Sequence, residues 1–119
     1  MTNNRKTGLN HEDEAASYLE DKGHRIIARN ELNRFGEIDI ISLAPDSTLV
    51  FTEVKYRKSD KAGSPLEAVD LKKIRKICRA SLMYINCHKQ YSEYRIRYDV
   101  IGISDDGITH IENAFDYTE

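Results

Sequence analysis

The sequence has only two cysteines, Cys78 and Cys87, and both stand outside any CxxC pattern. They fit neither a disulfide framework nor a zinc site, so we expect reduced thiols in a cytoplasmic protein. No apolar run approaches the ~20 residues needed to cross a bilayer. Residues 1–14 contain no apolar segment, so a secretory signal and a membrane partner are not expected.

The chain also lacks internal repeats, low-complexity segments and linkers. Its 119 residues are 39% hydrophobic and 32% charged, which suits one soluble domain with one core over residues 1–119.

The net charge is small but unevenly distributed. A formal charge of −2 argues weakly against a nucleic-acid-binding protein. Residues 54–79, however, carry nine Lys or Arg against three acids, a balance of +6, whereas residues 104–119 carry five acids and no Lys or Arg, a balance of −5. Such a basic stretch can bind a polyanion in a neutral protein, and a solvated helix face is an equally open interpretation.

Hydrophobic periodicity and capping residues predict the element order α-β-β-β-α-β-β. The first helix covers residues 9–22 and ends at Gly23. A second, long helix begins with Ser64 as its N-cap and Pro65 at its first position, and runs to about residue 86. Strands are expected at residues 24–30, 37–43, 49–57, 95–103 and 108–112. This order predicts an α/β fold with one mixed sheet flanked by two helices.

One side of each predicted helix is apolar and should face the core. In the first helix these residues are Leu9, Ala15, Ala16 and Leu19, and in the second they are Leu66, Val69, Ile74, Ile77, Cys78, Leu82 and Ile85.

The strands at 37–43 and 49–57 form a hairpin that carries charge among its apolar residues. Side chains alternate across a strand, and a five-residue loop at 44–48 is a common hairpin length. This register pairs Leu43 with Leu49, Ile41 with Phe51, Asp39 with Glu53 and Glu37 with Lys55. Apolar pairs then lie near the turn, and acids meet at the other end.

Two opposed carboxylates on one partly buried face need a counter-charge or a proton, because like charges there are destabilising. Lys55 supplies one positive charge and a divalent cation would supply two, with hard oxygen ligands suited to magnesium. Glu12 falls on or beside the apolar face of the first helix and adds a third acid; an edge position in solvent is the bland alternative for it. The hairpin therefore suggests a metal site.

A second pattern competes for the same role. Pro45 and Asp46 followed by Glu53 and Lys55 spell a "PD…ExK" nuclease signature. Residues 45–47 read better as turn chemistry, and Asp46 would lie at the far end of the hairpin from Glu53. Asp39 is therefore the preferred partner of Glu53.

Four segments together resemble the YraN-like family of small bacterial predicted endonucleases, which are distantly related to archaeal Holliday-junction resolvases. These segments are GEIDII (36–41), FTEVKYR (51–57), GSPLEAV (63–69) and RYDVIGI (97–103). The resemblance extends from about Gly8 to Ile103. It implies a restriction-endonuclease-like core of the PD-(D/E)xK superfamily.

The resemblance also implies roles for individual residues. Asp39 matches the metal-binding Asp, Glu53 the second acid, Lys55 the catalytic Lys and Glu12 the acid of the first helix. The family usually has Gly where this chain has His11.

The implied activity is hydrolysis of phosphodiester bonds in DNA. Whether the substrate is branched or junction DNA, a flap, single-stranded or duplex DNA, or RNA stays open. Mg²⁺ or Mn²⁺ would be held by Asp39, Glu53 and the Val54 carbonyl, with Glu12 acting through water. Lys55 would orient or deprotonate the attacking water. The basic segment would bind the nucleic-acid backbone, with Arg57, Lys72, Lys73 and Lys76 as candidates. By analogy with junction resolvases, a homodimer is also an expectation.

Two alternatives remain open at this level. One is a non-catalytic nucleic-acid-binding or scaffold protein on a nuclease fold, because fold does not imply function. The other is a structural hairpin held by ion pairs of Lys55 with Asp39 and Glu37, which explains the charges poorly because surface pairs contribute only ~0–1 kcal/mol.

Overall fold

The computed structural model describes residues 10–58 and 63–119. The described elements follow the predicted order, with two short 3₁₀ turns added. They are α2 (His11–Asp21), β1 (Arg25–Asn33), β2 (Gly36–Leu43), β3 (Leu49–Tyr56), η2 (Pro65–Ala68), α3 (Leu71–Cys87), η3 (Lys89–Tyr91), β4 (Ile96–Ser104) and β5 (Gly107–Phe115).

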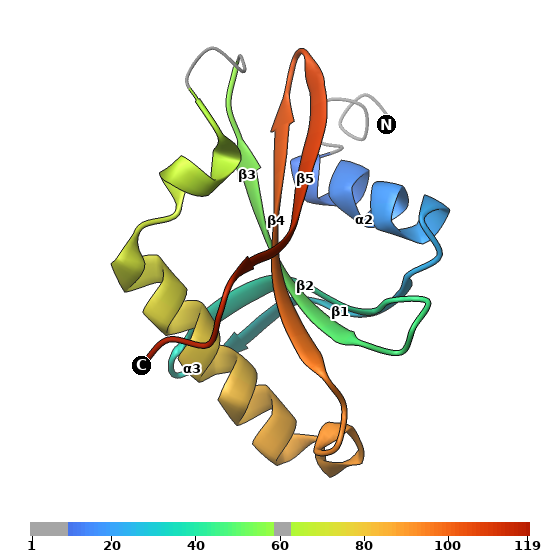
Figure 1. The fold of residues 1–119 in the computed structure, drawn as a ribbon, viewed down its shortest axis with the longest axis vertical. Coiled ribbons are helices and arrows are strands. Elements are labelled where there is room, and N and C mark those ends of the chain that lie inside the picture. Colours follow the sequence, from blue (N-terminus) through green and yellow to red (C-terminus); the bar gives the residue numbers. More distant parts are fainter. Residues whose placement is uncertain (1–9, 59–62) are drawn as a thin grey trace, which may run out of the picture.

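The five strands form one mixed sheet in the order β1-β2-β3-β4-β5. Neighbouring strands are antiparallel except β3 and β4, which are parallel. A parallel pair needs a crossover connection, and η2 with α3 provides it. Helices α2 and α3 lie on either side of the central strands (Figure 1), so the predicted α/β architecture with a mixed sheet between two helices is confirmed.

The first helix begins and ends close to the predicted residues. The Asn10 side chain accepts a hydrogen bond from the Asp13 N–H at 2.9 Å and caps α2. Gly23 has φ +93°, a conformation that side chains disfavour, and it terminates the helix. Ala15, Ala16 and Leu19 are buried as predicted, while Leu9 lies outside the described residues.

The second helix starts later than predicted. Ser64 does cap a turn, since its Oγ accepts from the Leu66 N–H, but that turn is the short η2. Val69 is extended, with φ −110° and ψ 100°, and α3 begins only at Leu71 with Asp70 as its N-cap. The prediction of one continuous helix from Pro65 was therefore wrong.

Tertiary packing explains this break. A Cβ built on Gly102 of β4 would lie 2.2 Å from Pro65 Cγ. Pro65 thus packs directly against the β4 backbone, where only glycine leaves room. The turn η2 therefore packs against the sheet, and α3 begins after it with its own N-cap, Asp70.

Two apolar clusters pack on the two faces of the sheet. Phe51, Tyr98 and Ile77 belong to the cluster beneath α3, and Leu19 and Ile101 belong to the cluster beneath α2. None of the helices in the described part of the chain has the length and apolarity needed to cross a membrane.

Candidate active site

The hairpin of β2 and β3 has the predicted register near its turn. Leu43 pairs with Leu49 and Ile41 pairs with Phe51, but the ladder ends at Ile40 and Thr52. The further predicted pairs, Asp39 with Glu53 and Glu37 with Lys55, do not form part of it. The Asp39 side chain instead accepts a hydrogen bond from the Val54 backbone N–H at 2.8 Å. A carboxylate thus takes the place of a ladder partner where the strands separate.

Glu53 is a buried acid between two lysines. Its side chain is 5% exposed, and its Oε2 lies 3.7 Å from both Lys55 Nζ and Lys73 Nζ. Its Oε1 is buried and has no hydrogen-bond partner among the described residues. Leaving a buried carboxylate oxygen unpaired is costly, so Glu53 has unused coordinating capacity.

The environment of Glu53 favours its protonated form. Burial raises its pKa to about 7, and the nearby Asp39 carboxyl adds to the rise through charge repulsion and a shared side-chain hydrogen bond. Lys73 and Lys55 oppose this rise. The pKa of Asp39 is also raised, chiefly by burial, against the hydrogen bond from Val54 N–H and the charge of Lys73. The two acids therefore bind protons more readily together than either would in water.

Glu12 comes from the first turn of α2. Its side chain is 21% exposed, and its Oε1 is buried without a hydrogen-bond partner among the described residues, although Arg29 lies 3.8 Å away. Burial raises its pKa, and the charge of Asp39 raises it further. Glu12 is thus close enough to Asp39 for the two charges to interact, and its role at the site stays a prediction.

These acids do not close into a complete ligand shell. Within residues 10–58 and 63–119, no group of three or more His, Cys, Asp or Glu side chains is arranged to hold a metal ion. The structure brings Asp39 and Glu53 together and leaves Glu12 at the edge of the pair.

A cavity of about 310 Å³ opens beside Glu53. Its lining contains four of the lysines predicted to contact the reaction or the nucleic acid. The lining residues are Lys55, Ala68, Asp70, Lys72, Lys73 and Lys76. We call this the lysine cavity. Asp70 is its one acid, and that carboxylate caps α3 by accepting from the Lys73 N–H at 2.9 Å. The cavity therefore suits an anion.

Arg57 is the remaining residue predicted to contact nucleic acid. Its guanidinium donates a hydrogen bond to the Gly63 carbonyl, and it is not among the residues that line the lysine cavity. Arg57 joins the end of β3 to the chain that leads into η2.

Asp46 occupies the turn, as its sequence context indicated. Its Oδ1 accepts from the Thr48 N–H at 3.1 Å, and Arg95 lies 3.4 Å from its Oδ2. Asp46 therefore belongs to the far end of the hairpin, and the "PD…ExK" spelling is coincidental.

Sequence reasoning missed a second polar cluster, centred on Asp99. Asp99 is fully buried and accepts hydrogen bonds from Arg97, from His110 Nε2 at 2.8 Å and from the Asn113 N–H at 3.0 Å. Burial opposes its ionisation, but these hydrogen bonds outweigh burial and lower its pKa. The Asn113 contact holds β5 where its pairing with β4 shifts register. The sequence feature that could have revealed this cluster is an Asp within the alternating strand 95–103. Because both carboxylate oxygens of Asp99 already accept hydrogen bonds, its role is structural.

The sequence matches a known family and its relatives over most of its length. A model of the family described as "Uncharacterised protein family UPF0102" matches residues 11–103. A UPF0102 protein of Persephonella marina is 41% identical over 109 residues, covering 92% of each chain. A UPF0102 protein of Syntrophus aciditrophicus is 47% identical over 104 residues, covering 87% of this chain and 80% of the relative.

Two solved structures are similar to part of this chain. One, described as the crystal structure of a repair endonuclease from Pyrococcus abyssi, has a TM-score of 0.44 and 20% identity, over 80% of this chain and 38% of the other. The other, described as the structure of an EndoMS–dsDNA complex, has a TM-score of 0.41 and 14% identity, over 78% and 36%. This chain spans well under half of either protein, and at such low identity neither likeness assigns an activity to it.

Proposed function

This chain belongs to the UPF0102 family, and we propose that it is a metal-dependent nuclease that hydrolyses phosphodiester bonds of DNA. The observation that carries the proposal is the position of Glu53. This buried acid lies beside Asp39, has one oxygen without a hydrogen-bond partner, and touches two lysines at the wall of a cationic cavity.

The oxygen donors of this site have the chemistry that a hard divalent cation prefers, although the described acids do not by themselves form a group of three ligands. Buried carboxylate oxygens without hydrogen-bond partners occur on both Glu53 and Glu12, and Mg²⁺ or Mn²⁺ prefers such oxygen ligands. Asp39 and Glu53 would hold the ion, the Val54 carbonyl would add a backbone ligand, and Glu12 would act through water. When bound, the ion supplies Lewis-acid polarisation of the phosphate and a more acidic water.

The lysines have separable roles in this proposal. Lys55 would orient the attacking water or accept its proton and, with Lys73, offset the charge that develops on the phosphate. Lys72 and Lys76 line the same cavity and would bind the neighbouring backbone phosphate. Acid, cation and anion site are thus adjacent, as phosphoryl-transfer chemistry requires.

The second candidate is a nucleic-acid-binding protein without catalysis. It would use the same lysine cavity, but it gives no reason to bury an acid that lies beside two lysines and has one oxygen without a hydrogen-bond partner. A purely structural hairpin is disfavoured, since no ion pair within the described residues joins Lys55 to Asp39 or Glu37.

A cleavage screen tests the proposal. Linear duplex, single-stranded, flap and four-way-junction DNA would be incubated with the protein and Mg²⁺ or Mn²⁺. Glu53→Gln is the active-site variant, and Glu37→Gln, which changes an exposed acid of the same hairpin, is its matched control. We expect metal-dependent cleavage that Glu53→Gln abolishes and Glu37→Gln retains. Tight binding without cleavage of any substrate would favour the binding protein instead.

A further inference from the structure

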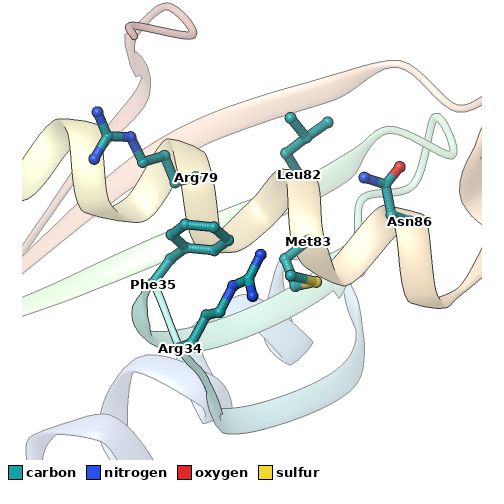
Figure 2. Close-up of a pocket in the computed structure, with 6 residues that line it drawn as sticks. All are labelled: Arg34, Phe35, Arg79, Leu82, Met83 and Asn86. Carbon is teal, nitrogen blue, oxygen red and sulfur yellow. The ribbon is translucent and has the colours of Figure 1, made fainter.

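A second cavity lies further along α3, away from the acids. Its volume is about 360 Å³, and it is lined by Arg34, Phe35, Arg79, Leu82, Met83 and Asn86. Figure 2 shows Arg34 and Phe35, from the turn between β1 and β2, facing the side chains of α3. We call this the turn–helix pocket.

The pocket combines an apolar surface with positive charge. Phe35, Leu82 and Met83 provide the apolar part, and Leu82 is 47% exposed although its helical spacing predicted a core position. The Arg34 guanidinium lies 4.9 Å from the centre of the Phe35 ring. No acid is among the lining residues, so the pocket favours a flat, apolar group attached to an anion.

The turn that forms one wall is held in place. The Asn33 side chain donates to the Ala80 carbonyl of α3 at 3.1 Å and accepts from the Phe35 N–H at 3.0 Å. The pocket therefore exists before any ligand arrives, which lowers the entropic cost of binding.

The turn–helix pocket and the lysine cavity are both lined by residues of α3. A Cβ on Gly36 would lie 3.7 Å from the Cβ of Lys76, a residue that lines the lysine cavity. Along α3, Lys76 and Met83 are about 10 Å apart at the helical rise of 1.5 Å per residue, and Arg79 lies between them. A single polyanionic chain can thus contact both.

We propose that the turn–helix pocket binds an unpaired base of the nucleic-acid strand whose phosphates occupy the lysine cavity. This inference rests on the proposed function and specifies its substrate as DNA with a single-stranded or branched region. Bases stack on aromatic rings and on guanidinium planes, as Phe35 and Arg34 would allow. The Asn86 amide offers both a donor and an acceptor to a base edge. Bases inside an intact duplex are already stacked and paired, so they cannot enter.

A second copy of this chain is a poorer occupant. A two-fold interface places the same patch against itself, which would bring Arg34 and Arg79 toward their own copies without an acid in the lining. A nucleic-acid strand neutralises both arginines.

Binding is measured by fluorescence anisotropy in a chelator, so that no cleavage occurs. The probes are three oligonucleotides of equal length at one salt concentration: single-stranded DNA, duplex DNA and a single strand of abasic sites. We expect the single strand with bases to bind at least about fivefold more tightly than the abasic strand, given the contribution of one stacked base. Leu82→Asn and Asn86→Ala should remove most of that difference. Ile108→Asn, which changes an exposed apolar residue of β5, is the control and should keep it.

Equal binding of the three probes by the wild-type chain overturns the inference. So does a Leu82→Asn variant that binds DNA normally but changes the oligomeric state by light scattering, since the pocket is then an interface between copies. The proposed function can fail separately. If the protein prefers the strand with bases but cleaves no substrate, the base-binding pocket is supported and the nuclease proposal is contradicted. If the protein cleaves DNA but shows no preference for bases, the nuclease proposal is supported and the base-binding pocket is contradicted.

Discussion

Lys73 Nζ lies 3.7 Å from Glu53 Oε2, as close as Lys55 Nζ on the acid's own strand. The contact joins the first turn of α3 to β3, the central strand of the sheet, and the charge of Lys73 opposes the rise in the pKa of both Glu53 and Asp39. Lys73 thus does more than extend a basic surface, because it helps to keep the acid pair ionised.

Replacing Lys73 with Met should raise the pKa of Glu53 above its present value of about 7. Since a divalent ion binds the ionised acids, the pH at which Mn²⁺ produces half of its stabilising effect should move upward, by up to about one unit. At high pH, where both acids are ionised, the stabilisation by Mn²⁺ should be as large in the variant as in the wild type. Thermal melts with and without Mn²⁺ across pH 6–9 measure this. Lys76→Met is the control, since Lys76 lines the same cavity. An equal shift of the pH midpoint in both variants would mean that the Lys73–Glu53 contact is not its cause.

The raised pKa of Glu53 makes the metal-free protein sensitive to pH. A carboxyl whose pKa is higher in the folded state stabilises the fold fully below its unfolded value, here 4.5, and that stability is lost as the pH rises through about 7. Glu53→Gln mimics the protonated acid. In a chelator at pH 8 the variant should therefore exceed the wild type in free energy of unfolding by roughly 2–3 kcal/mol, and the gap should close near pH 4.5. Urea unfolding at the two pH values measures this difference. A difference in free energy of unfolding that does not change with pH would contradict a raised pKa for Glu53.

Asp99, unlike Glu53, is expected to stabilise the fold, so its replacement should destabilise the protein. Asp99→Ala leaves Arg97 and His110 without their buried partner and should cost about 3–5 kcal/mol in free energy of unfolding. Glu112→Ala is the matched control. Its carboxylate also approaches Arg97, at 3.8 Å, but is 58% exposed, so its loss should cost under about 1 kcal/mol. Urea unfolding compares them. A mild Asp99→Ala variant that lost its metal response would place Asp99 in the active site instead.

The lysine cavity predicts a steep salt dependence of nucleic-acid binding. Each phosphate contact contributes about 0.7–0.9 to the slope of log affinity against log salt. Lys72→Glu, Lys73→Glu and Lys76→Glu should each reduce that slope by about one. Lys89→Glu, on the exposed turn η3, should leave the slope unchanged within about 0.3. Anisotropy titrations between 50 and 300 mM salt measure it, and an affinity independent of salt would exclude a surface that tracks phosphates.

The sequence predicted what depends on local pattern. Alternation and a five-residue loop were enough to pair Ile41 with Phe51, because a one-residue slip would turn every apolar side chain outward. The same reasoning failed beyond Ile40, where the Asp39 carboxylate competes with a backbone carbonyl for the Val54 N–H. Such competition between side chain and backbone is not visible in hydrophobic periodicity.

Contacts between distant segments were also beyond the sequence. Ser64 and Asp70 are both good N-caps, and only the packing of Pro65 against Gly102 decides that α3 starts at the second. That start places Lys73 beside Glu53. Helical spacing pointed Leu82 at the core, but its neighbour is the turn that carries Phe35, and a pocket lies between them. Local propensity could not indicate this.

Asp39→Asn separates a metal site from a structural hairpin. The change removes one negative charge beside Glu53 but keeps an oxygen that can accept from the Val54 N–H. If the acids form a metal site, the metal-free variant should be at least as stable as the wild type, because a repulsion is relieved. It should also lose the rise in melting temperature that Mg²⁺ or Mn²⁺ gives the wild type by mass action, together with any cleavage. If the acids are structural, the variant should lose about 1–3 kcal/mol of stability in the absence of metal and respond to metal as the wild type does. Melting curves in chelator and in Mn²⁺ compare the two. A less stable metal-free variant, combined with a wild type that shows no metal response, would defeat the nuclease proposal.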